Sequence, residues 1–402
     1  MELFLDDHTK KAIELIRSLG KEYLRPLGIE ADTLARAIPP DHPFFQLIAS
    51  SGYMSRGLGS AQDTATKSKS GDTKNSRPGT WVCNVLIAEE GSYWDRGALV
   101  SLPGPGLGGP PVLQMGTLEQ QSRFLSVFRQ RERPVWAAFA MTEPEAGSDV
   151  ARIRTNARRD GDEWILNGQK MYSSNSPRAE WVVVFATIDI ELGRAGHRAF
   201  VVERGTKGFE ILRIEHKMGI RAYETASFAL DNCRIPYENL LGGENYYSEK
   251  GKKGFEGAMS TFNATRPIVA AMGIGIARAA YDIALKFVEE DYPKHAAGRL
   301  RKALEQLAAM QRKIMLSRLL CLKAASLLDQ GKPNALAASS AKQYAPPMCL
   351  EVVEHATDIL GEAGIAKDGL LEKLARDVKA IDIVEGTQQI QRRVISKNII
   401  SR

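Results

Sequence analysis

An ionisable side chain stands at a break between two helical patterns near the C-terminus. Glu385 follows residues 371–380, which are rich in Leu, Ala, Lys and Arg, and precedes a second amphipathic pattern in residues 390–395. Gly386 can turn the backbone here, and Thr387 can cap the new helix. Glu385 is then expected beside a helix N-terminus, facing whatever the helices enclose. From this stretch alone, a solvated acid before a cap is an equally open interpretation.

A second stretch has the residue types of a ligand-binding loop. Residues 139–149 read Phe-Ala-Met-Thr-Glu-Pro-Glu-Ala-Gly-Ser-Asp. The loop offers backbone N–H groups, Thr and Ser hydroxyls and a glycine for close approach, which suit a planar polar ring or a phosphate. An ordinary turn is the alternative, although Thr-Glu-Pro-x-Ala-Gly-Ser-Asp is far more specific than an isolated glycine.

Composition excludes several other classes of function. The chain has 402 residues, 44% of them hydrophobic, so it can bury a substantial core. The six histidines do not pair at ligand spacing, which predicts no metal site. The formal net charge of +6 and pI near 9.0 favour anionic ligands. No basic run is interleaved with aromatic residues, so nucleic acid is not an expected partner.

Cysteine usage and hydropathy predict the cellular setting. The four cysteines are scattered and form no C-x-x-C pair, which is typical of a reduced protein. No apolar run has the length of a membrane span, and residues 1–10 lack a signal-peptide pattern. We therefore expect a cytoplasmic protein with no membrane span.

The elements that must position these residues fall into three regions. We expect a mainly α protein with a central β domain: an N-terminal helical domain in residues 1–134, a β-barrel or sandwich in 135–250, and a four-helix bundle in 251–402. Residues 61–79 are predicted to form a polar surface loop without catalytic residues. Asn167-Gly168 predicts a hairpin turn after a short strand. Pro346-Pro347 should kink or restart the third bundle helix.

Together with these regions, five motifs in the right order resemble the acyl-CoA dehydrogenase family. They are residues 139–149, 166–175 (Leu-Asn-Gly-Gln-Lys-Met-Tyr-Ser-Ser-Asn), 217–222 (Lys-Met-Gly-Ile-Arg-Ala), 262–267 (Phe-Asn-Ala-Thr-Arg-Pro) and 385–392 (Glu-Gly-Thr-x-Gln-Ile-Gln-Arg). The resemblance runs from about Gly116 to the C-terminus, and its nearest pattern is that of the medium-chain-type members.

The resemblance implies an FAD-dependent oxidoreductase of fatty acid metabolism, as in β-oxidation, that converts an acyl-CoA thioester to the trans-2-enoyl form. Glu385 falls on the family's catalytic base, which removes the α-proton while hydride leaves the β-carbon for flavin N5. The thioester oxygen is held in the family by the backbone N–H of the base and a flavin ribityl hydroxyl. An electron-transfer flavoprotein is the implied electron acceptor, and a dimer or tetramer the implied assembly.

The remaining site residues are carried over position by position. Arg266 matches a substrate-side arginine, but it could also be a structural arginine of the bundle. Tyr172-Ser173-Ser174 replaces the commoner Trp-Ile-Thr and keeps both an aromatic ring and a hydroxyl. The resemblance assigns to the cofactor Phe139, Met141, Thr142, Gly147, Ser148, Tyr172, Ser173, Ser174, Thr387 and Gln389, and to the substrate Ser148, Asn263 and Arg266.

Three departures from the family pattern leave the assembly open. Asp291 stands where an arginine usually reaches the FAD diphosphate of a neighbouring subunit, and Asp358 and Glu362 stand near a Gln-x-x-Gly-Gly element. Acids at these positions would repel phosphates. We therefore keep as alternatives a subunit completed by a homologous chain, an acyl-carrier-protein-linked dehydrogenase, an oxidase, and a paralogue without flavin.

Overall fold

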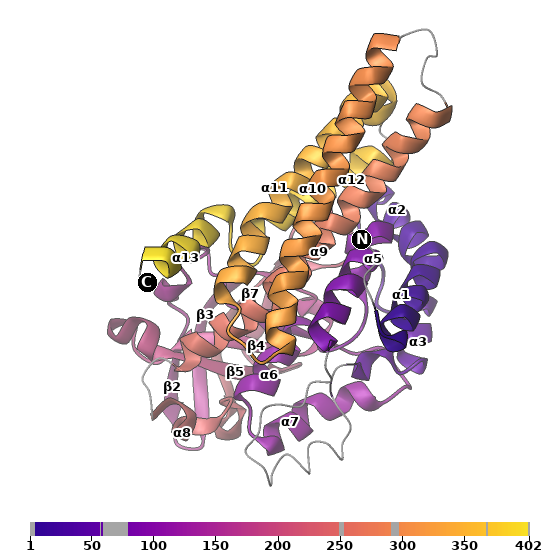
Figure 1. The fold of residues 1–402 in the computed structure, drawn as a ribbon. Helices are drawn as coiled ribbons and strands as arrows, with labels where there is room; N and C mark the ends of the chain where they lie inside the picture. The colour runs from indigo at the N-terminus through magenta and orange to yellow at the C-terminus, as the bar shows by residue number, and fades with distance from the viewer. Residues whose placement is uncertain are drawn as a thin grey trace.

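The N-terminal region is helical and packs beside the C-terminal helices. The computed structural model describes residues 5–56, 58, 79–248, 253–290, 297–366 and 369–400, so the predicted loop at 61–79 lies outside the described residues except for Gly79. The helices of this region are α1 (Asp7–Leu19), the π-helical turn η1 (Gly20–Leu24), α2 (Arg25–Thr33), α3 (Pro43–Ser50), α5 (Thr80–Ser101), α6 (Gly109–Met115) and α7 (Leu118–Leu125). In Figure 1 they surround one side of the central sheet.

The middle region is one curled, mixed sheet, as expected of a central β domain. Its strands are β1 (Trp136–Ala140), β2 (Asn156–Asp160), β3 (Glu163–Ser174), β4 (Ala179–Thr187), β5 (His197–Glu203), β6 (Phe209–Ile214) and β7 (Thr225–Pro236). Among the described residues they pair in the order β1-β4-β2-β3-β7-β6, and β5 pairs with β4. β1 runs parallel to β4, whereas β3 and β7 are antiparallel. The loop at residues 141–149 therefore follows the end of β1 and contacts β3.

The hairpin predicted at Asn167-Gly168 is wrong. β3 continues through both residues with a register shift between Leu166 and Gly168, and the reversal occurs instead at Gly161, between β2 and β3. A Cβ on Gly168 would lie 2.6 Å from the Thr155 backbone. The glycine is therefore explained by the close approach of a neighbouring chain segment, not by a turn.

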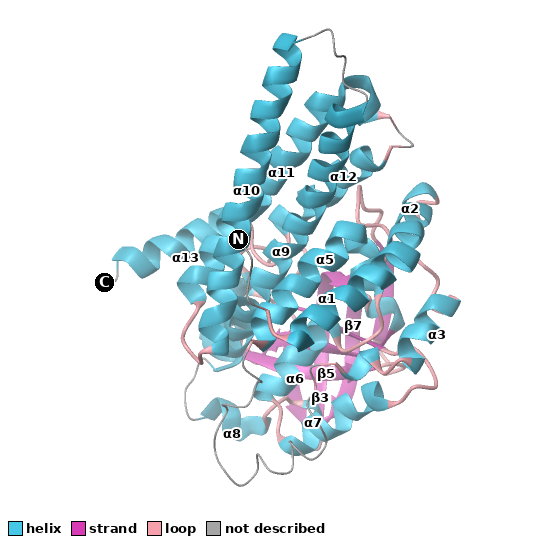
Figure 2. Ribbon diagram, turned by 45° about the vertical axis from the view of Figure 1, so that its right-hand side comes forward, coloured by secondary structure: helices cyan, strands magenta, loops and turns pink. Residues whose placement is uncertain are grey.

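In the C-terminal region, long helices rise above the sheet (Figures 1 and 2). They are α9 (Lys253–Glu290), α10 (Ala297–Asp329), α11 (Ala335–Leu360) and α12 (Leu370–Ile383). The short helix α8 (Gly243–Ser248) lies low in both views, before this group, and α13 (Gln388–Ile400) extends to the side. The expected restart at Pro346-Pro347 is wrong, because α11 is a single helix through both prolines. It packs against α9, α10, α12 and α13, and this tertiary packing overrides the local cost of proline.

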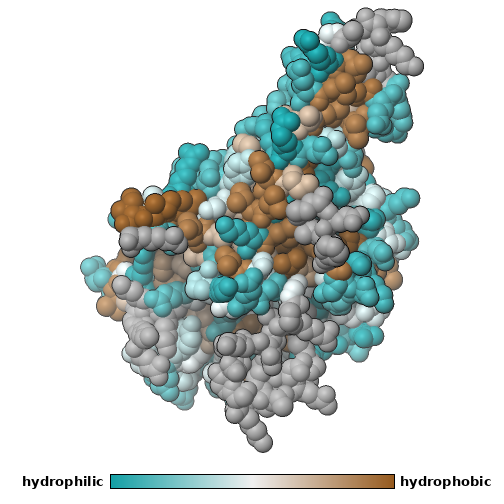
Figure 3. All heavy atoms as spheres, viewed as in Figure 1, coloured by the Kyte–Doolittle hydropathy of each residue, from teal (hydrophilic) through white to brown (hydrophobic). Residues whose placement is uncertain are grey.

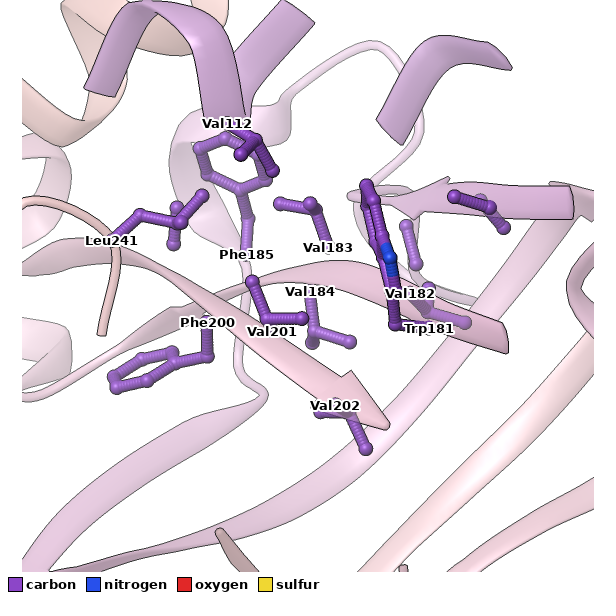
Figure 4. Packing of buried hydrophobic residues seen from close by; sticks show 14 of the residues in the cluster. Val112, Trp181, Val182, Val183, Val184, Phe185, Phe200, Val201, Val202 and Leu241 are labelled. Carbon is purple, nitrogen blue, oxygen red and sulfur yellow. The ribbon is translucent and has the colours of Figure 1, made fainter. Parts of the chain in front are cut away.

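Separate hydrophobic clusters stabilise the three regions. The sheet cluster includes Trp181, Phe185 and Phe200, which pack with Val112 of α6 and Leu241 (Figure 4). A second cluster lies among α9–α12, and a third joins the first helices to α5. Helix α9 is apolar and long enough to cross a membrane by composition, but 61% of its most apolar window is buried inside the fold, so it is a core helix. All four cysteines are buried and free.

Candidate active site

Glu385 lies on the short turn between α12 and α13, with a backbone that side chains of other helices hold in place. Its φ of 56° and the φ of 94° at Gly386 are both left-handed, and for a glutamate this conformation costs about 1–2 kcal/mol. Side-chain donors contact the backbone carbonyls of Glu385 and Gly386. Arg266 Nε lies 3.4 Å and Gln391 Nε2 lies 3.3 Å from the carbonyl oxygen of Glu385. Gln391 and Lys342 Nζ donate to the Gly386 oxygen at 3.1 and 3.3 Å. The turn is therefore fixed by groups on α9, α11 and α13.

Among the described residues, only one of the two carboxylate oxygens of Glu385 has a hydrogen-bond partner. Its Oε2 accepts a hydrogen bond from Thr265 Oγ1 at 2.9 Å, while Oε1 is buried and has no hydrogen-bond partner among the described residues. Burial raises the pKa of Glu385, and Thr265, Arg266, Lys342 and Arg96 oppose that rise without cancelling it. A desolvated carboxylate with a free oxygen and a raised pKa is well suited to accept a proton.

A buried ion pair holds the loop at residues 141–149. Lys170 Nζ, fully buried on β3, donates to Glu143 Oε1 at 2.7 Å and to the Met141 carbonyl at 3.1 Å. The other donors to Glu143 are the backbone N–H groups of Arg154 and Thr155, at 2.6 and 2.9 Å. Burial alone would raise the pKa of Glu143, but Lys170 and the backbone donors lower it below the ordinary value. The loop is therefore fixed from within by an ionised glutamate.

The expected cofactor residues of this loop present both buried and open groups. Met141 is buried, Phe139 and Thr142 are half-buried, and Gly147 and Ser148 are exposed. The Thr142 carbonyl accepts from Met171 N at 2.9 Å, which joins the loop to β3. A Cβ added to Gly147 would meet no atom within 4 Å, so a ligand can approach the backbone there. The arrangement leaves the Thr and Ser hydroxyls available to a bound polar group.

The end of β3 adds an exposed aromatic ring. Tyr172 is 60% exposed and has a φ of 56°, a strained backbone for a bulky residue. Ser173 Oγ donates to the Phe139 carbonyl at 3.0 Å, so the strand end is tied to β1. Ser174 is half-buried. The exposed ring of Tyr172, beside the polar groups of the loop at residues 141–149, is suited to stack on the planar ring of a flavin.

Substrate-side residues expected on α9 lie next to the base. Arg266 Nη1 donates to Asn263 Oδ1 at 2.8 Å, and Asn334 Nδ2 donates to the Asn263 carbonyl at 2.8 Å. Phe262 contacts Phe139 with ring centroids 5.7 Å apart, so α9 meets the strand that leads into the loop. The structure therefore brings Asn263 and Arg266 together with Glu385, between the sheet and the bundle.

The other expected residues lie at the edges of the molecule. Thr387 directly precedes α13, and Gln389 is exposed on its first turn. Asp358 and Glu362 are exposed at and beyond the end of α11, and Asp291 lies outside the described residues. Their roles toward a neighbouring subunit remain predictions.

Sequence reasoning missed several residues of the site. Thr265 was part of the motif at residues 262–267 but was assigned no role, and its hydroxyl contacts the Glu385 carboxylate. Lys342 and Gln391 are fully buried polar residues whose donors reach the turn. Gln391 sits inside a motif that was already identified, so its position offered a signal. Lys342 and Arg96 belong to other segments, and only the fold brings them near Glu385.

Comparison with known proteins identifies the family of this chain. Residues 138–233 match the family model "Acyl-CoA dehydrogenase, middle domain", and residues 252–400 match "Acyl-CoA dehydrogenase, C-terminal domain". Cyclohexane-1-carbonyl-CoA dehydrogenase of Syntrophus aciditrophicus is 32% identical over 97% of this chain and 96% of its own length. A 3-(aryl)acrylate reductase of Clostridium sporogenes is 36% identical over 79% of this chain and 82% of its own.

A solved structure agrees over the whole fold. Butyryl-CoA dehydrogenase of Megasphaera elsdenii superposes with a TM-score of 0.86 at 29% identity, and the match covers 100% of both chains. The Glu385 turn and the loop at residues 141–149 thus occur within a shared architecture. This chain belongs to the acyl-CoA dehydrogenase family and is an FAD-dependent oxidoreductase that acts on a CH–CH bond of an acyl-CoA.

Proposed function

We propose that the protein oxidises a saturated acyl-CoA to the trans-2-enoyl-CoA with Glu385 as the base for the α-proton. The observation that carries this proposal is the free, buried Oε1 of Glu385 beside a single hydroxyl donor. FAD, when bound, accepts the hydride that leaves the β-carbon. The proton moves from the α-carbon to the Glu385 carboxylate, and the desolvated setting strengthens that carboxylate as a base.

The backbone of the same turn supports the second half of the proposal. As the α-proton leaves, negative charge grows on the thioester oxygen, which needs fixed donors. The Glu385 N–H makes no hydrogen bond to another of the described residues, so it is free to donate to that oxygen. Because Arg266, Lys342 and Gln391 hold the carbonyls of the turn, the N–H and the carboxylate keep a fixed relation to each other.

The loop at 141–149 and the end of β3 would hold the cofactor. In this proposal Met141 and Thr142 would hold the edge of the flavin ring, Tyr172 would stack on it and the Ser174 hydroxyl would serve N5. Ser148 would serve the diphosphate, and Thr387 and Gln389 the adenosine half. Support comes from the exposure of Tyr172, Gly147 and Ser148 on a loop that Glu143 and Lys170 fix.

The proposed function is tested with the purified chain and its bound flavin. Absorbance in the visible range measures FAD, and anaerobic addition of acyl thioesters should bleach it while mass spectrometry detects a product two hydrogens lighter. Coenzyme A and acyl-carrier-protein thioesters of the same acyl group identify the carrier. An electron-transfer flavoprotein, compared with oxygen, identifies the acceptor. Absence of bleaching with every thioester, in a protein that holds FAD, would contradict the proposal.

We also propose that the enzyme is an oligomer of the cytoplasm, either of identical chains or with a second, homologous chain that completes the flavin site. The second assembly follows from the acids that stand where the family places groups that bind the FAD diphosphate. Asp358 and Glu362 are exposed and have no ion pair among the described residues, and an exposed acid repels an approaching diphosphate. Exposed isoleucines at 383, 399 and 400 mark the region of α13 as a subunit contact; Figure 3 shows this hydrophobic surface.

Native mass and flavin content decide between the two assemblies. A homo-oligomer that carries about one FAD per chain and turns over substrate would contradict the heteromer. Poor FAD binding by the chain alone, restored by a homologous chain with the Arg-x-x-Phe-Gly and Gln-x-x-Gly-Gly elements, would support it. Its expected stoichiometry is one FAD per pair of unlike chains.

A further inference from the structure

A cluster of three buried charges joins α12 to a distant part of the chain. Lys373 Nζ on α12 lies 2.5 Å from Asp95 Oδ2 on α5 and 2.6 Å from Asp377 Oδ2, one turn further along α12. Lys373 is 5% exposed, Asp95 2% and Asp377 1%. Because burial removes the water around such ions, the cluster is stable only while all three groups keep their positions.

The second oxygen of each acid holds an irregular stretch of backbone. Asp95 interrupts α5 with a φ of −163° and a ψ of 118°, and its Oδ1 accepts a hydrogen bond from Ala98 N at 2.8 Å, just after the break. Asp377 Oδ1 accepts from the N–H of Ile220, whose φ of 49° is left-handed. A left-handed backbone is unfavourable for a β-branched residue and persists only where the surrounding structure enforces it. The two acids therefore tie both stretches to α12.

Residues 217–222 also lie directly against the backbone of α12. A Cβ added to Gly219 would lie 2.6 Å from the Arg376 backbone carbon. Arg376 Nη1 donates to the Met218 carbonyl at 2.6 Å, and the same guanidinium pairs with Asp32 on α2. These contacts leave little room for α12 to slide or rotate. Its position is therefore set jointly by α2, α5 and residues 217–222.

The turn that carries Glu385 is the direct continuation of α12. At 1.5 Å per residue, Asp377 lies about 9 Å before the end of the helix at Ile383. Thr265 and Lys342 contact the turn from α9 and α11. A displacement of α12 at the charge cluster would move the turn against these contacts, because a helix is stiff over two turns. The position of the Glu385 carboxylate therefore depends on the cluster as well as on its own partners.

We propose that Asp95, Lys373 and Asp377 act together as one positioning unit for Glu385. This inference rests on the proposed function, in which Glu385 takes the α-proton. The unit holds α12 where the carboxylate can reach the α-carbon at hydrogen-bond distance, and a misplacement of ~1 Å can slow such a step on the order of 100-fold. Since the three side chains act through the helix, their substitution should slow proton abstraction and leave thioester binding nearly unchanged.

Stopped-flow reduction of the bound flavin under anaerobic conditions tests the proposal. The probes are straight-chain acyl-CoA thioesters, cyclohexane-1-carbonyl-CoA and the matching acyl-carrier-protein thioesters, and the probe that bleaches the unmutated enzyme fastest is titrated. Asp95→Asn and Asp377→Asn should each lower the rate at saturation by ~10-fold, while the half-saturating concentration stays within ~3-fold. Only molecules that hold flavin give the signal, so partial unfolding does not imitate a slow step.

The double variant tests whether the two acids form one unit. Independent effects would multiply to a loss of ~100-fold, whereas two acids that share one cation should together lose no more than ~20-fold. A multiplicative loss, or normal rates in both single variants, overturns the inference and leaves the proposed function intact. If no probe bleaches the flavin of the unmutated enzyme, the proposed function is overturned and this inference with it.

Further variants separate positioning from a purely structural role. The matched control is Glu90→Gln, which removes another buried acid of α5, paired with Arg17 and Arg278 at 2.8 and 3.2 Å and not with α12. It should lower stability but leave the rate at saturation within ~2-fold. Lys373→Met should be slow and Lys373→Arg, which keeps a cation between the acids, intermediate. These two variants decide the question if the Asn variants hold no flavin. Normal rates in both, or a loss in Glu90→Gln as large as in Asp377→Asn, would overturn the inference.

Discussion

Two glutamates, Glu143 and Glu385, have carboxylates in opposite surroundings. Glu143 accepts a hydrogen bond from Lys170 and two from backbone N–H groups, and its pKa is lowered. Glu385 accepts from one hydroxyl, Thr265, keeps one oxygen free, and has a raised pKa. Both are glutamates whose pKa desolvation would raise, so the difference lies in the donors. A fully paired carboxylate fixes a loop, whereas a poorly paired one is available to take a proton.

The two regions also use their cations differently. In the sheet, Lys170 contacts the carboxylate itself. At the turn, Arg266 and Lys342 donate to backbone carbonyls, so their charges hold the chain without forming an ion pair with Glu385. Arg266 and Lys342 therefore fix the turn, and their charges also oppose the rise in the pKa of Glu385. The different surroundings of the two glutamates predict different outcomes when each is removed.

The largest effect is expected from Glu385→Gln. The amide keeps the shape of the side chain but cannot take the α-proton, so bleaching of the flavin by substrate should slow by at least ~100-fold. FAD content and the circular dichroism spectrum should remain unchanged. Glu354→Gln, on the exposed side of α11, serves as the control and should react normally. Rapid flavin reduction by Glu385→Gln would show that the base is another group.

The second-largest effect is expected on the stability of the fold when Glu143 is substituted. Glu143→Gln leaves Lys170 buried without its ion-pair partner and should reduce the free energy of unfolding by about 3–5 kcal/mol, measured by urea denaturation. Glu145→Gln removes an exposed pair with Arg154 and should cost at most about 1 kcal/mol.

Two further measurements sharpen this result. The double variant Glu143→Gln with Lys170→Met should recover part of the loss, because no buried charge remains. The contribution of Glu143 is complete above its ordinary pKa and is lost as pH falls through its lowered folded-state pKa. A Glu143→Gln protein as stable as the unmutated one would contradict a structural role for the pair.

The smallest expected effect concerns the pH dependence of Glu385. The base must be ionised, so flavin reduction should increase as pH rises through its pKa, which burial raises. The Thr265 hydroxyl lowers that pKa, and Thr265→Val should therefore move the acidic limb of the profile to higher pH. Thr357→Val, whose hydroxyl bonds to a carbonyl of its own helix, should leave the limb in place. A shift to lower pH would contradict this account of the base.

The sequence predicted the elements that carry local signals. Glu385 and Gly386 form the expected turn because helical patterns end and restart around them. The order of helices, sheet and helices is confirmed, since each region has its own hydrophobic period. By contrast, Asn167-Gly168 was assigned to a turn because the close approach of Thr155 to Gly168 cannot be read from neighbouring residues.

Long-range contacts account for what the sequence could not provide. Arg96 and Glu385 are separated by most of the chain, and nothing in either segment indicates that the charge of Arg96 acts on Glu385. The same is true of Lys342, which reads as an ordinary charged residue of α11 yet is fully buried against the turn. Buried polar groups of this kind depend on how helices pack, which is why the motif at residues 139–149 was recognised from the sequence and the surroundings of Glu385 were not.

The four buried thiols can serve as probes of how the fold opens. Cys83 lies in the N-terminal helices, Cys233 in the sheet, and Cys321 and Cys349 in the bundle. Burial raises the pKa of Cys233 to about 11 and that of the bundle thiols well above the ordinary value, so all three are poor nucleophiles in the folded state. A thiol reagent can react with each of the four buried cysteines only after the packing around that side chain opens. Its modification times, assigned by peptide mass, would therefore give the sequence in which the three regions open.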